Sequence, residues 1–149
     1  MRFESIFLIT LMLLVPVTHL VGSVEATSAR SQPCGGTICI NEVMPNPNGY
    51  DDAAWPNGEW LELHNSGTSS VDVRNWYFSN KAAKTLMLNA ASIVGFDANN
   101  ASTYTIAPGD YMIVARNAST NFYVANTDDF MTLYDSTSGW VDEATWNSS

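Results

Sequence analysis

The stretch EWLELHN at positions 59–65 decides the fold class of this chain. Leu61 and Leu63 fall on one side of an extended strand, whereas Trp60 and Glu62 fall on the other side. Strict alternation of this kind is typical of a strand that packs one face on a core and leaves the other face more open.

Similar short segments continue along the chain and are separated by turn-forming residues. The segment 81–91 (KAAKTLMLNAA) has a helical composition, but it is too short to require a helix. Turn chemistry every 8–12 residues or so predicts a two-sheet, all-β sandwich of about seven to eight short strands. The other candidate strands are 39–44, 71–73, 76–78, 111–115, 130–134 and 140–146, with weaker signals at 84–88 and 103–106.

Composition and charge narrow the function classes. The chain has 149 residues, 46% of them hydrophobic, which suits one domain with a substantial core. Six Lys and Arg residues stand against 15 Asp and Glu residues, for a net charge of −9. Neutralising phosphate requires clustered Lys and Arg, so we expect neither nucleic-acid binding nor attachment to an anionic membrane surface.

The first residues have the layout of a secretory signal. Arg2 precedes an apolar run at 6–17, and small residues follow before Ala26. We therefore expect a signal peptide at 1–26, with cleavage after Ser23 as the second choice and a retained anchor as the alternative. A polar linker at 27–37 and one domain at 38–149 would follow. The prediction is a secreted or cell-surface protein without stable membrane insertion after cleavage.

Two cysteines, Cys34 and Cys39, flank a short segment that begins with two glycines. In an exported protein a cysteine pair predicts a disulfide, and so small a ring would mainly fix the start of the first strand. Metal binding is the competing interpretation. After signal cleavage His64 would be the only histidine, so a tetrahedral zinc site would lack ligands.

INEVMPNP at 40–47 and GEWLELHNSGTSSVDVRNWYFS at 58–79 together resemble the lamin-tail domain family, in its exported prokaryotic type. The resemblance extends through IAPGDYMIVARN at 106–117 and the closing hairpin at 127–146. Asn75 replaces the family's usual glycine, and asparagine tolerates a left-handed backbone best after glycine. The matching residues are Glu42, Glu59, Trp60, Glu62, Leu63, Asn65, Val71, Asp72 and Trp76.

The resemblance implies an immunoglobulin-like antiparallel β-sandwich in which Glu42, Glu59, Trp60, Glu62, Asn65 and Trp76 belong to the scaffold. Prokaryotic members of the family occur in exported proteins, often beside hydrolase, nuclease or cell-surface modules. We therefore expect a non-catalytic module for binding, adhesion or cell-surface structure. The alternative is an accessory domain of a secreted hydrolase or nuclease whose catalytic part lies outside this chain.

The loop at 46–58 (NPNGYDDAAWPNG) is the best candidate for a binding site, because loops on rigid sandwiches commonly carry function. Its exposed aromatic residues would contact a cell-surface protein or a glycan. Calcium at Asn48, Asp51 and Asp52 is a less favoured hypothesis than an ordinary turn cluster, and we expect no cofactor. The candidate binding residues are Asn46, Asn48, Tyr50, Asp51, Asp52 and Trp55.

No catalytic constellation stands out among the carboxylates and histidines. Glu59 and Glu62 lie three residues apart on one strand and so point to opposite faces. Glu42 and Glu62 are expected to hydrogen-bond the backbone or a neighbouring strand. His64 has no nucleophile arranged beside it in any known motif and is expected to be a half-buried strand residue. The resemblance places Trp60 and Trp76 in the core.

Overall fold

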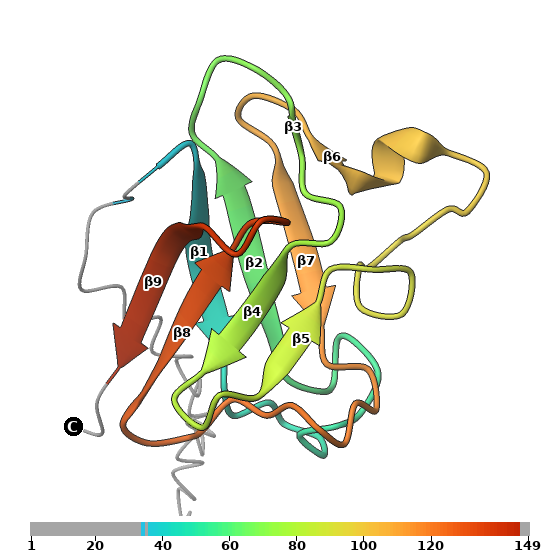
Figure 1. Ribbon diagram of the computed structural model, residues 1–149. Helices are drawn as coiled ribbons and strands as arrows, with labels where there is room; N and C mark the ends of the chain where they lie inside the picture. Colours follow the sequence, from blue (N-terminus) through green and yellow to red (C-terminus); the bar gives the residue numbers. More distant parts are fainter. Residues whose placement is uncertain (1–33, 35, 147–149) are drawn as a thin grey trace, which may run out of the picture.

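The computed structural model describes Cys34 and residues 36–146 (Figure 1). Each of the nine candidate segments contains a strand there, including the two with weaker signals. The predicted signal peptide at 1–26 and most of the linker lie outside the described residues. The elements are β1 (Ile38–Met44), β2 (Trp60–Asn65), β3 (Val71–Asp72), β4 (Tyr77–Asn80), β5 (Thr85–Met87), the 3-10 helix η1 (Ala101–Tyr104), β6 (Thr105–Ile106), β7 (Tyr111–Ala115), β8 (Asp129–Tyr134) and β9 (Trp140–Trp146).

Two antiparallel sheets form the body of the domain (Figure 1). One has the strand order β1-β2-β7 and the other has the order β5-β4-β8-β9. A third, two-stranded pair joins β3 to β6. The prediction of an all-β, immunoglobulin-like sandwich is therefore confirmed.

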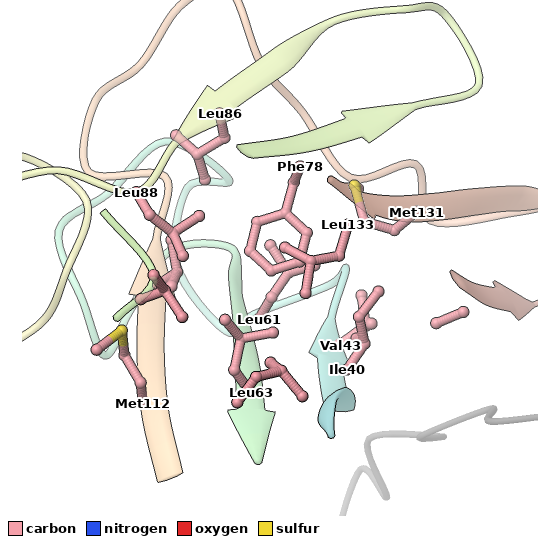
Figure 2. Packing of buried hydrophobic residues seen from close by; sticks show 14 of the residues in the cluster. Ile40, Val43, Leu61, Leu63, Phe78, Leu86, Leu88, Met112, Met131 and Leu133 are labelled. Atoms are coloured by element: carbon pink, nitrogen blue, oxygen red, sulfur yellow. The ribbon is translucent and has the colours of Figure 1, made fainter. Parts of the chain in front are cut away.

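The core lies between the two larger sheets (Figure 2). Leu61 and Leu63 of β2 are fully buried, as the alternation in the sequence predicts. From the opposite sheet, Phe78 of β4 and Leu133 of β8 point into the same cluster. Buried residues alternate with more exposed ones along β2, β4 and β9, so the two sheets bury one face each against the other.

The segment 81–91 does not form a helix, and its middle residues form β5 instead. Leu86 of β5 is buried in the core, while its neighbours Thr85 and Met87 are exposed. Asn75, which stands at the family's glycine position, has a φ of 64°. This left-handed backbone is the conformation expected there, and asparagine is a residue type that tolerates it.

Asn65 connects three segments at the end of β2. Its buried side-chain amide donates hydrogen bonds to the carbonyl oxygens of Ser69 and Ile106, at 2.9 and 2.8 Å. Its Oδ1 accepts a hydrogen bond from the Gly67 backbone N–H at 2.9 Å. Burying an amide this completely is favourable only when its donors and acceptor are satisfied, as they are here.

The Cys34–Cys39 disulfide is present, with the two Cα atoms 5.4 Å apart. Beside it, the buried Asp142 of β9 accepts a hydrogen bond from the Ile40 backbone N–H at 2.8 Å. The start of β1 is therefore held by the disulfide and by the opposite sheet. Among the described residues, no helix has the length and apolar character needed to cross a membrane.

Candidate ligand-binding site

The candidate binding loop at 46–58 is compact because its backbone folds closely on itself. Backbone hydrogen bonds of 2.9 and 3.0 Å run from the Ala53 N–H to the Tyr50 oxygen and from the Asn57 N–H to the Ala54 oxygen. A Cβ atom at Gly58 would overlap the Ala53 backbone, and one at Gly49 would overlap the Asn57 carbonyl oxygen. Only glycine permits so close an approach at these two positions.

Backbone contacts also hold the loop to the segment after β7, which lies beside it in Figure 1. The Asp52 carbonyl oxygen accepts a hydrogen bond from the Ala118 N–H at 2.8 Å. The Trp55 N–H donates to the Asn117 side-chain oxygen at 3.1 Å. These contacts fix the path of the loop while leaving its side chains out of the anchoring.

A cavity of about 180 Å³ lies between the loop and the start of β2. Among the residues that the structure describes, no charged side chain lines it. Its lining instead combines amide groups with one indole, one thioether and two proline rings. The lining residues are Met44, Asn46, Pro47, Asn48, Pro56, Asn57 and Trp60.

Trp60 occupies a different place from the one that the resemblance implied. It is half-buried and lines the cavity, and it is not part of the core cluster. The physical reason is the parity of the strand: Leu61 and Leu63 point inward, so Trp60 must point outward. Trp76 is also only half-buried, although it packs against the core. The prediction that both tryptophans are buried is therefore wrong.

The structure separates the predicted loop residues into two groups. Asn46 and Asn48 line the cavity, and both residues are exposed. Tyr50 and Trp55 are 85% and 41% exposed and lie outside the cavity lining. Asp51 and Asp52 are exposed as well, with their backbone oxygens engaged in anchoring the loop.

Glu59 and Arg116 form a buried ion pair beneath the loop, which the sequence reasoning missed. Arg116 Nη1 lies 2.9 Å from Glu59 Oε2, which also accepts the Val124 backbone N–H at 3.0 Å. The second carboxylate oxygen, Oε1, is buried and has no hydrogen-bond partner among the described residues. A lone arginine directly after an apolar strand, in a chain rich in acids, was the available signal.

Burial dominates the electrostatics of this pair. Loss of solvation raises the pKa of the Glu59 carboxyl from 4.5 to about 7, although the hydrogen bonds from Val124 and Arg116 act in the opposite direction. Protonation at Oε1 would leave both hydrogen bonds to Oε2 intact. The pair therefore has a site that can take up a proton close to neutral pH.

Glu42, Glu62 and His64 lie on the paired strands β1 and β2. Glu62 Oε1 accepts a hydrogen bond from the Asn41 side chain at 2.7 Å, and Glu42 stands opposite Glu62 in the strand register. His64 is half-buried, and its ring stacks on Tyr111 with the ring centroids 4.5 Å apart.

Metal-ligating residues come together at one point of the described chain. Cys34, Cys39 and Asp142 offer ligand atoms within 4.8 Å of one another, but the two sulfurs are bonded to each other in the disulfide. Sulfurs joined in this way are not thiolate ligands. Calcium at Asn48, Asp51 and Asp52 stays a less favoured hypothesis than an ordinary turn cluster.

Comparison with known proteins agrees with the fold and the motif. The family model described as Lamin Tail Domain matches residues 31–148. The chain therefore belongs to the lamin tail domain family. No curated protein matches the chain.

Proposed function

We propose that this protein is an exported, non-catalytic binding module of the prokaryotic lamin-tail type, and that it binds a glycan at the cell surface. The observation that carries the proposal is the uncharged cavity between Trp60 and the 46–58 loop. An indole face together with side-chain amides suits a ligand that has both an apolar face and hydroxyl groups, as a sugar ring does.

The surroundings of the cavity support the same class of ligand. Tyr50 and Trp55 offer further aromatic surface on the same loop. The loop is held in place by its own backbone contacts, so little conformational entropy would be lost on binding. Family membership supports a role without catalysis, because lamin tail domains are immunoglobulin-like modules rather than enzymes.

Binding is best tested with soluble cello-, xylo-, manno- and chito-oligosaccharides, using calorimetry and NMR chemical shifts. We expect at least one series to bind and to shift the Trp60 indole signal. Asn48→Ala should weaken binding without unfolding the domain, because Asn48 is exposed. Trp60→Ala should abolish binding, with folding checked by circular dichroism.

Trp140→Ala provides the matched control, because Trp140 is 57% exposed on β9 and does not line the cavity. It should leave binding unchanged. The proposal is overturned if no oligosaccharide binds, or if Trp140→Ala weakens binding as much as Trp60→Ala does.

Export is tested separately, with a tag placed after Ser149 and fractionation of the producing cells. We expect the protein outside the cytoplasm, with a new N-terminus at Thr27 or Val24. A tagged protein that stays in the cytoplasm with Met1 intact would contradict the export part of the proposal. The Cys34–Cys39 disulfide is compatible with an oxidising compartment.

A further inference from the structure

Strand β5 is an edge of the four-stranded sheet, and its outward backbone groups follow from the register (Figure 1). The bonds from Leu88 N–H to Trp76 oxygen and from Asn80 N–H to Lys84 oxygen mark hydrogen-bonded pairs between β4 and β5. Such pairs alternate in an antiparallel ladder. The backbone groups of Thr85 and Met87 therefore point away from β4.

One of these outward groups is already engaged within the domain. The Met87 carbonyl oxygen accepts a hydrogen bond from Ser92 Oγ at 2.6 Å. Within the described part of the chain, the N–H and C=O of Thr85 and the N–H of Met87 have no protein partner on the outer side of β5. This leaves two donors and one acceptor aligned along an open edge.

The open edge borders a groove of about 270 Å³. One wall consists of β5 and the residues that follow it, and the other is the segment after β7. Both walls carry small or uncharged side chains apart from Arg116. The lining residues are Thr85, Leu86, Met87, Asn89, Ala91, Ser92, Arg116, Asn117, Ala118 and Ser119.

The charge at one end of this groove is opposite to that of the whole chain. Lys81 and Lys84 lie in the turn between β4 and β5, and both are exposed. They are the only cations among the described residues without a close ion pair, since Arg74 pairs with Asp72 and Arg116 with Glu59. The nearby Asp129 is buried and accepts the Lys81 backbone N–H.

We propose that the β5 edge binds an acidic peptide in extended conformation, which adds to the sheet as a further strand. The unpaired backbone groups supply the hydrogen bonds that a new strand needs, and the groove gives its side chains room. Lys81 and Lys84 supply the preference for acidic residues. Because the lysines stand in the turn rather than within β5, they do not themselves block the edge against pairing.

The probe is a capped eight-residue peptide in which Val and Glu alternate, titrated into the isotope-labelled protein. We expect binding that shifts the amide signals of Thr85 and Met87 and slows their hydrogen exchange. A peptide with Lys in place of Glu should bind more weakly. Raising the salt concentration should reduce the difference between the two peptides.

Thr85→Pro removes one outward N–H while keeping the bonds between β4 and β5, because proline is tolerated on the open side of an edge strand. We expect roughly fivefold weaker peptide binding, the equivalent of one net hydrogen bond. Thr85→Val keeps the N–H and is the matched control. It should bind the peptide as the unchanged protein does.

The double substitution Lys81→Gln and Lys84→Gln should remove the preference for the Glu peptide and leave the melting temperature unchanged. Three results would overturn the proposal: neither peptide binds, the Glu and Lys peptides bind equally well, or the shifts map to the 46–58 loop instead. If the double variant aggregates and the unchanged protein binds neither peptide, the lysines serve only to prevent self-association at the β5 edge, and the proposal is likewise wrong.

Discussion

Glu59 and Arg116 lie 57 positions apart in the chain, yet their side chains meet at 2.9 Å beneath the candidate binding loop. The Glu59 side chain is 1% exposed and that of Arg116 is 13% exposed. Glu59 also carries the backbone N–H that donates to the Asp51 carbonyl oxygen. The residue that forms the buried ion pair therefore also anchors the binding loop through its backbone.

Arg116→Met removes the cation and keeps much of the side-chain volume. We expect a loss of about 3 kcal/mol in the free energy of unfolding at pH 8, because it leaves a buried carboxylate without its partner. Urea denaturation measures this loss. At pH 5.5, where Glu59 is neutral, the loss should be smaller. Equal losses at both pH values would contradict the argument.

Arg74→Met is the matched control for this substitution. Arg74 forms a more exposed ion pair with Asp72, at 3.5 Å, and its guanidinium lies 4.8 Å from the centre of the Tyr104 ring. We expect a loss of about 1 kcal/mol or less, because contacts near the surface are well solvated.

The raised pKa of Glu59 predicts that stability falls as the pH rises. The folded protein keeps the Glu59 proton up to a pH of about 7, whereas the unfolded chain releases it near 4.5. The stabilisation is complete below pH 4.5 and is lost between pH 4.5 and 7, by about 3 kcal/mol. Urea denaturation across this range measures the slope.

Glu59→Gln should remove most of that slope and serves as the control. Asp135 does not interfere, because hydrogen bonds from Thr137 and Gly139 lower its pKa, so its contribution is lost only below the pH range tested. Stability that rises between pH 5 and 7, or an unchanged slope in Glu59→Gln, would contradict the raised pKa of Glu59.

Gly58→Ala should displace the binding loop, because the added Cβ would overlap the backbone of Ala53. We expect a loss of about 1–3 kcal/mol, the usual cost of an extra group in a packed place, and NMR shifts spread over the loop. Gly36→Ala is the control, because its Cβ would meet Val141 oxygen at an ordinary 3.6 Å. Similar stability for both variants would contradict the tight packing of the loop.

Calcium is not expected to stabilise the domain. The melting temperature should be the same with added calcium and with a chelator. Asp51 and Asp52 are exposed, and their carbonyl oxygens already accept hydrogen bonds from the Glu59 and Ala118 backbone N–H groups. A rise in melting temperature with calcium that Asp51→Asn abolishes would establish the site that we do not favour.

The fold could be predicted from local patterns because strands with one buried face show it directly. Leu61 and Leu63 revealed both the strand and its inward face, and the turn residues marked the strand ends. The same alternation places Trp60 on the outer face of the strand. The family resemblance implied a core position for Trp60, and the alternation was the more accurate guide. The left-handed backbone at Asn75 could be predicted because such a conformation is determined by the type of the single residue that adopts it.

The candidate site could be predicted only in part, because its parts meet through contacts between distant residues. The loop stood out by composition, and Asn46 and Asn48 do line a cavity. Arg116 was missed because its partner lies 57 positions away, and no local pattern encodes that distance. The open edge of β5 depends on the strand order of the sheet, which alternation does not determine.

The anchoring of the 46–58 loop has a practical consequence for protein engineering. At Asp51, Asp52 and Trp55 the loop makes its anchoring hydrogen bonds with backbone atoms rather than with side chains. Its tight backbone approaches require glycine at positions 49 and 58. Tyr50, Asp51 and Asp52 can therefore be randomised while the loop keeps its shape. A combinatorial library at these three positions would turn the domain into a small scaffold for selecting new binders, much as antibody loops diversify on a constant framework.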